Sequence, residues 1–125
     1  MPDRVLLDTN ALIAGAGGNA EVAISVMTIA ELRIGVLRAR DATQRSLRLG
    51  RLEQVEQTIE ALPVDRAVAV EYARLVAILR DHGRTVRPID TLIAATARAA
   101  ELPVVTADRD FAPLADLGGI AVRWE

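Results

Sequence analysis

Two aspartates in this chain stand where an open parallel sheet would bring them to the same edge. Asp8 directly follows the apolar run Arg4–Leu7, and Asp108 lies just beyond a second apolar run at Pro103–Thr106. Both runs have the character of short buried strands. Ligands of open α/β sheets bind outside the carboxyl ends of the strands, so both carboxylates are candidate functional groups.

Two further acids are candidates for the same edge. Glu31 follows a strand predicted at Val22–Met27, and Asp90 opens a predicted Ala-rich helix that runs to about Glu101. Like charges about 4 Å apart repel by several kcal/mol at an effective dielectric near 20, so a cluster of these four needs protons or a cation. We therefore expect a metal centre if the fold brings them together.

The available ligand types select the metal. The chain has no Cys and a single His, His82, which excludes thiolate sites and sites built from several histidines. Hard divalent ions prefer oxygen ligands, so an all-carboxylate site indicates Mg²⁺, with Mn²⁺ as a substitute. Such an ion orients and polarises a phosphodiester and activates water, which is nuclease chemistry. Thr9 and Thr106 are candidate supporting hydroxyls beside two of the acids.

Each acid except one also has a structural interpretation. Glu31 has the spacing of a capping box with Thr28, Asp90 follows Pro88 as a helix N-cap would, and Asp108 can cap a short helix. Only Asp8, placed directly after an apolar strand, has no evident capping role. Spacing alone therefore leaves both interpretations open.

The elements that must position these acids alternate along the chain. Strands are predicted at Arg4–Leu7, Val22–Met27, Pro103–Thr106 and Ile120–Trp124, and helices at 28–37, Thr43–Leu62, Arg66–Asp81, Asp90–Glu101 and Phe111–Leu117. This alternation predicts an α/β sandwich of three layers, with a mainly parallel central sheet. We expect one domain over residues 1–125, with a helical hairpin inserted at Thr43–Arg80.

Composition narrows the class of protein. Hydrophobic residues make up 51% of the chain, but only three residues are aromatic, which argues against an aromatic platform for stacking bases. The net charge is -2, and all fifteen cations are arginines, so any chemistry that needs a catalytic Lys is excluded. There is no apolar run of about 18 residues and no basic leader, so we expect a cytoplasmic protein that does not contact membranes.

Four segments resemble the sequence blocks of the PIN-domain family. The small size of the chain and its helical middle are similar to those of the VapC-type toxins in that family. The four segments are Val5-Leu-Leu-Asp8-Thr-Asn10, Thr28-Ile-Ala-Glu31-Leu32-x-x-Gly35, Asp90-Thr-Leu-Ile93-Ala-Ala-Thr-Ala97 and Val104-Val-Thr106-Ala-Asp108-Arg-Asp110-Phe111. The blocks occur in the family's order and extend across the chain.

The resemblance implies a Mg²⁺-dependent endoribonuclease, the toxin of a toxin–antitoxin pair. It places Asp8, Glu31, Asp90 and Asp108 around the metal and implies products with 5′-phosphate and 3′-hydroxyl ends. In this interpretation three aspartates hold one or two ions, and Glu31 binds through water or orients the attacking water. We prefer Asp108 to Asp110, because Asp108 holds the family's position after Thr.

The resemblance also implies the partners: an RNA substrate, a homodimer, and a cognate antitoxin with a segment that lies over the site. Arginines would position the RNA, since phosphate contacts supply most of the affinity. The densest group of arginines consists of Arg33, Arg38, Arg40, Arg45, Arg48 and Arg51.

Other functions remain open. A haloacid-dehalogenase-like phosphatase needs Asp-x-Asp, but position ten is Asn10, and no Lys is present. A non-catalytic nucleotide-binding or regulatory module would use Gly15-x-Gly17-x-x-Ala20, which lies too far beyond the first strand for a dinucleotide fingerprint. A PIN fold that serves only in protein interaction would have no reason to retain four acids.

Overall fold

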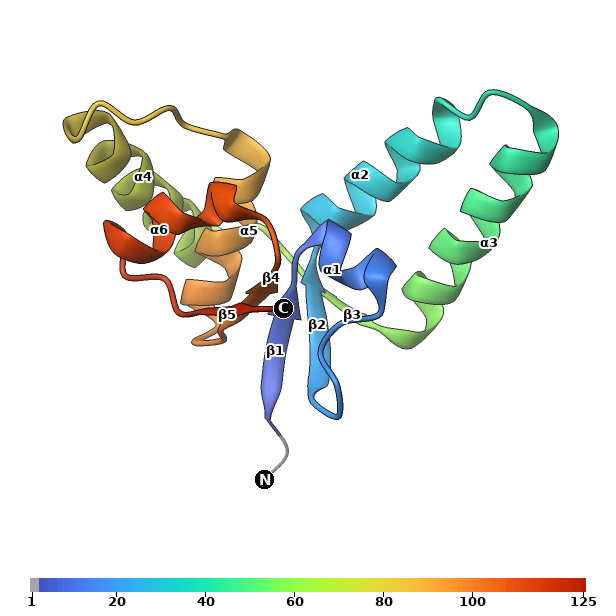
Figure 1. The fold of residues 1–125 in the computed structure, drawn as a ribbon, viewed down its shortest axis with the longest axis horizontal. Coiled ribbons are helices and arrows are strands. Elements are labelled where there is room, and N and C mark those ends of the chain that lie inside the picture. The colour runs from blue at the N-terminus through green and yellow to red at the C-terminus, as the bar shows by residue number, and fades with distance from the viewer. Residues whose placement is uncertain (1–2) are drawn as a thin grey trace.

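A five-stranded parallel sheet forms the centre of the computed structural model, which describes residues 3–125 (Figure 1). Its strands are β1 (Arg4–Leu7), β2 (Glu21–Ser25), β3 (Glu60–Leu62), β4 (Val104–Thr106) and β5 (Val122–Trp124). Their order across the sheet is β3-β2-β1-β4-β5, and each neighbouring pair is parallel. All carboxyl ends therefore meet at one edge.

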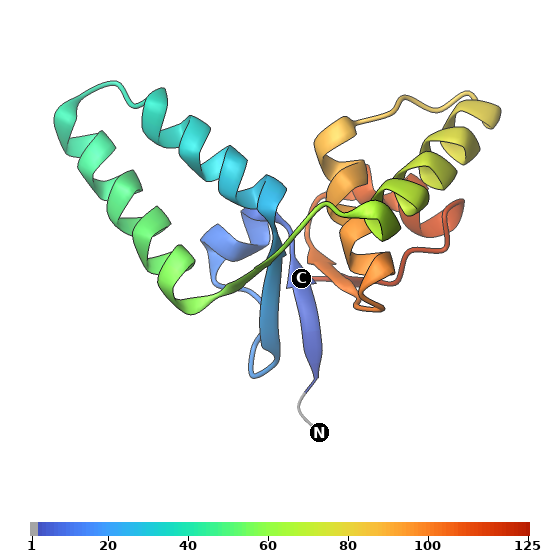
Figure 2. The same ribbon diagram turned by 180° about the vertical axis from the view of Figure 1, so that it is seen from behind.

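The helices form two groups on opposite sides of the sheet, which Figures 1 and 2 show as two wings. One group contains α1 (Thr9–Ala14), α2 (Val26–Leu37) and α3 (Ala42–Thr58). The other contains α4 (Arg66–Asp81), α5 (Pro88–Ala99), a 3-10 turn η1 (Arg109–Phe111) and α6 (Ala112–Asp116). This arrangement confirms the predicted three-layer α/β fold.

Alternation along β1 divides the core into two halves. Val5 and Leu7 are buried against α1, α2 and α3, whereas Leu6 is buried against α4, α5 and α6. In β4, Val105 belongs to the first half and Val104 to the second. Successive strand residues point to opposite faces, so a strand buried on both sides reads as a continuous apolar run.

The inserted helical hairpin is present, but its predicted position at Thr43–Arg80 is wrong. Helices α2 and α3 form the hairpin (Figure 1), and α3 ends at Thr58. Ile59 is extended, and Glu60–Leu62 pairs with β2 as an edge strand. The apolar spacing of Ile59 and Leu62 fits a continued helix, but pairing with β2 satisfies backbone groups that a lone helical turn would leave to solvent.

Helix α4 has the bounds that the sequence predicts. The Asp65 carboxylate accepts a hydrogen bond from the Val68 N–H at 3.0 Å, which caps the first turn. The helix ends at Asp81 with His82 as its C-cap, and Gly83 follows with a left-handed φ of 67°. Within residues 3–125, no helix combines the length and apolar character needed to cross a bilayer.

Candidate metal centre

The centre of the sheet is the place where the chain reverses its direction of winding. From β1 the chain proceeds to β2 and β3 on one side, then returns to β4 and β5 on the other. The carboxyl ends of β1 and β4 are therefore neighbours at a topological switch point, where open α/β sheets bind their ligands. Asp8 follows β1 there, and Thr106 is the last residue of β4.

Asp8 is buried at this point, with 4% of its surface exposed. One of its carboxylate oxygens accepts from the Ala11 N–H at 2.8 Å and caps α1, so the expectation that Asp8 has no capping role is wrong. The other accepts from the Thr106 hydroxyl at 2.5 Å. Among residues 3–125 no cationic side chain pairs with Asp8, so both of its contacts are to neutral groups.

Thr106 links Asp8 to the acids that follow β4. While its hydroxyl donates to Asp8, the same oxygen accepts from the Asp108 N–H at 2.9 Å. The Asp108 carboxylate in turn accepts from the Asp110 N–H at 2.9 Å, which caps η1. These bonds orient the segment after β4 relative to the end of β1.

Glu31 is not part of a capping box. Helix α2 begins at Val26, and its cap is Ser25, whose hydroxyl accepts from the Met27 N–H at 3.0 Å. Glu31 therefore lies inside the helix, where its carboxylate accepts from the Thr9 hydroxyl at 2.5 Å. Since Thr9 adjoins Asp8, this bond ties Glu31 to the end of β1.

Asp90 is also not a helix cap, because α5 begins at Pro88 with Arg87 as its cap residue. Its carboxylate accepts from the Arg87 guanidinium at 3.1 Å. Burial raises the pKa of Asp90, and the charges of Asp108 and Glu31 raise it further, while Arg87 acts in the opposite direction. Three of the four candidate acids are thus electrostatically coupled.

The tightest acidic cluster contains Asp90, Asp108 and Asp110, each of which offers one carboxylate oxygen within 4.8 Å of the others. Asp110 joins Asp108 there, although the family position favoured Asp108 alone. Arg87 pairs with both Asp90 and Asp110 at 3.1 Å. The sequence did not predict this role, and the only signal for it was that Arg87 lies three residues before Asp90. Asp8 and Glu31 are not members of this cluster: Asp8 is linked to the Asp108 backbone through Thr106, and Glu31 is bonded to Thr9.

This donor set fits a hard divalent cation. The possible ligands at the edge are carboxylate and hydroxyl oxygens, and within residues 3–125 no His or Cys joins the acidic cluster. The glycine-rich segment after α1 is not a phosphate loop, because Gly15 ends that helix in a left-handed conformation with φ of 72°.

Replacing Asp90 tests the electrostatics of the metal-free protein. Its pKa in the folded chain lies above 3.8, the ordinary value, so ionisation of Asp90 destabilises the native state as the pH rises from 3.8 through the folded pKa. In EDTA at pH 7 we expect Asp90→Asn to melt above the wild type, since the exposed pair with Arg87 contributes little. The difference in melting temperature between Asp90→Asn and the wild type should shrink as the pH is lowered toward 3.8. A variant that melts below the wild type at pH 7 would contradict this.

Comparison with known proteins adds family information to this geometry. The PIN domain family matches residues 5–117. Ribonuclease VapC5 of Mycobacterium tuberculosis is 44% identical over 121 residues, which cover 90% of this chain and 89% of that protein.

Solved structures agree with the sequence comparison. The crystal structure of VapBC-5 from Mycobacterium tuberculosis, a member of the VapBC family of toxin–antitoxin systems, matches with a TM-score of 0.88 and 41% identity. That match covers 99% of this chain and 100% of the other. FitAcB from Neisseria gonorrhoeae matches with a TM-score of 0.75 and 28% identity, over 97% of this chain and 96% of the other.

Proposed function

Because this chain belongs to the PIN domain family, we propose that it is a metal-dependent ribonuclease and the toxin of a VapBC-type toxin–antitoxin pair. The observation that carries the proposal is the acidic edge between β1 and β4, where Asp8 is buried and has no cationic partner among residues 3–125. An uncompensated buried charge is costly unless a cation shares the site.

The chemistry follows from the ligand types. We assign Asp8, Asp90 and Asp108 as the residues that hold the metal, and Mg²⁺ as the ion, with Mn²⁺ as a substitute. Such an ion orients a phosphodiester, polarises it and lowers the pKa of a water molecule that it binds. We assign to Glu31, whose carboxylate accepts from the Thr9 hydroxyl, the role of orienting the attacking water. Thr106 keeps Asp8 and the segment of Asp108 in register.

The partners follow from the same relatives. RNA is the substrate class, because a relative is named Ribonuclease VapC5, and an antitoxin protein is the partner, because VapBC-5 belongs to a family of toxin–antitoxin systems. A homodimer remains a prediction. A cytoplasmic site of action is a further prediction.

The direct test is cleavage of a structured RNA by the purified protein in Mg²⁺, in Mn²⁺ and in EDTA. We expect cleavage in both metals and none in EDTA, with 5′-phosphate ends on the products. RNA that stays intact in the presence of a metal shown to bind would refute the ribonuclease assignment. Cleavage that persists in EDTA would refute the metal dependence.

Metal binding also has a readout that does not depend on activity. A ligand that binds only the folded state raises its melting temperature, so Mg²⁺ should stabilise the wild type more than Asp90→Asn. Asp116→Asn is the matched control, because Asp116 is an exposed acid on α6, outside the cluster. Equal shifts for all three proteins would exclude Asp90 as a ligand.

A further inference from the structure

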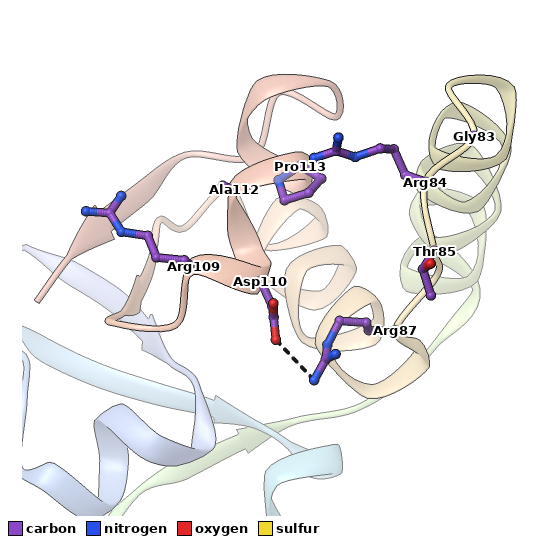
Figure 3. A pocket seen from close by; sticks show the side chains of 8 residues that line it. All are labelled: Gly83, Arg84, Thr85, Arg87, Arg109, Asp110, Ala112 and Pro113. Carbon is purple, nitrogen blue, oxygen red and sulfur yellow. Dashed lines mark ion pairs between the residues drawn. The ribbon is translucent and has the colours of Figure 1, made fainter.

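A hollow of about 520 Å³ lies beside the acidic cluster, between the segment after α4 and the start of α6 (Figure 3). Arg84, Thr85 and Arg87 form one wall, and Asp110 and Pro113 lie opposite. Its volume falls within the roughly 300–1,000 Å³ of ligand sites in proteins.

This hollow adjoins the candidate metal centre. A second hollow of about 430 Å³ is lined by Glu31 and Asp90 and shares Thr85 and Arg87 with the first. The two hollows therefore adjoin at Thr85 and Arg87, with Glu31 and Asp90 on one side and Arg84 on the other, and we refer to them together as the groove. Arg87 stands at the junction, where it pairs with Asp90 on one side and Asp110 on the other.

The outer hollow is basic in a chain whose net charge is -2. Its lining includes three arginines and one acid, Asp110. Arg87 is turned toward Asp110, while the Arg84 side chain extends along the hollow toward Pro113 (Figure 3). Within residues 3–125 no ion pair engages Arg84. Its guanidinium is free to bind an anion.

The arginines that sequence reasoning favoured for RNA are partly engaged elsewhere. Arg33 lies 3.9 Å from the Glu56 carboxylate, and Arg48 donates to the carbonyl of Gly35 at 2.7 Å. Both contacts hold α2 against α3. Neither residue lines the groove that leads to the acids.

We propose that the outer hollow binds a phosphate of the RNA strand next to the phosphodiester at the acidic centre. This inference rests on the proposed ribonuclease function. Arg84 supplies the main contact, since a guanidinium binds phosphate through two parallel hydrogen bonds. The Thr85 hydroxyl lies in the same wall, and Arg87 is placed to contact the strand where it enters the acidic part of the groove.

The test measures binding apart from cleavage. A short single-stranded RNA of mixed sequence is titrated in EDTA with the wild type, Arg84→Ala, Arg84→Lys and Arg66→Ala. Arg66 is the matched control: an exposed arginine at the first residue of the sixteen-residue helix α4, whose far end leads to the hollow. The helix rise places it roughly 24 Å from that end.

We expect Arg84→Ala to weaken RNA binding about tenfold, at the lower end of what hydrogen bonds to charged groups contribute. The slope of log K against log salt should fall by about 0.7, the value for one phosphate contact on a single strand. Arg84→Lys should retain the slope, and Arg66→Ala should match the wild type. In Mg²⁺, Arg84→Ala should raise KM more than it lowers kcat.

Two outcomes overturn the inference. In the first, Arg84→Ala and Arg66→Ala bind RNA with the same affinity; in the second, the wild type binds no RNA. If the wild type cleaves RNA while Arg84→Ala binds normally, only the phosphate site is refuted. If Arg84 governs RNA binding but no metal supports cleavage, the ribonuclease assignment fails and the binding site stands.

Discussion

Asp8→Asn is expected to lower the kcat of RNA cleavage about 10²–10³-fold while leaving the fold intact. The change removes the charge of a residue that we propose as a metal ligand, and deleting one group that stabilises developing charge usually lowers kcat about 10²–10³-fold. Asn still accepts the hydrogen bond from Ala11 N–H, because Asn and Asp are equivalent as helix caps. The amide nitrogen of Asn cannot accept from the Thr106 hydroxyl as the second carboxylate oxygen of Asp8 does. This loss opposes the gain from removing a buried charge, so the metal-free melting temperature should change little.

Asp41→Asn is the matched control for this variant. Asp41 caps α3 by accepting from the Gln44 N–H at 2.7 Å, but it is exposed and lies away from the acidic edge. It should cleave RNA like the wild type. An Asp8→Asn protein that is folded and cleaves at wild-type rate would show that Asp8 serves only as a cap.

Thr106→Val is expected to lower both activity and stability. Val matches the shape of Thr but cannot donate to Asp8 or accept from the Asp108 N–H, and this site is fully buried. Loss of a buried hydrogen bond to a charged group should reduce the free energy of unfolding by about 2 kcal/mol. Groups that orient metal ligands typically contribute about 10–100-fold to metal affinity or activity. Metal titration and denaturant unfolding measure the two effects.

Thr106→Ser separates the hydroxyl from the methyl group. Ser retains the donor and the acceptor, so metal affinity should stay near that of the wild type, even if stability falls slightly from the lost methyl group. If Thr106→Val and Thr106→Ser lose metal affinity equally, the hydroxyl has no role in positioning Asp8.

The sheet and two of its acids could be predicted from sequence because the signal is local. Asp8 and Asp108 follow short apolar runs, and a run buried on both faces has few alternatives to a parallel strand. Alternation of elements then places both acids at one edge. The bounds of α4 were predictable for the same reason, since Asp65 and Gly83 mark its ends.

The sequence-based predictions that were wrong concern positions where tertiary pairing overrides a local pattern. Glu60–Leu62 continues a helical stripe, yet β2 offers it backbone partners. Glu31 has the spacing of a capping box, but Ser25 starts the helix earlier. Contacts between distant segments, such as that of Arg87 with Asp110, leave no pattern in sequence at all. The positions of Asp8 and Asp108 were therefore predictable, but the groove and the pairing of Arg87 with the acidic cluster were not.

A crystal structure of the protein soaked in Mn²⁺, with the ion located by its anomalous scattering, tests the central claim most directly. We predict an ion at the edge between β1 and β4, coordinated by the carboxylates of Asp8, Asp90 and Asp108. An ion held elsewhere, or one bound by Asp110 and Asp90 without Asp8, would contradict the account.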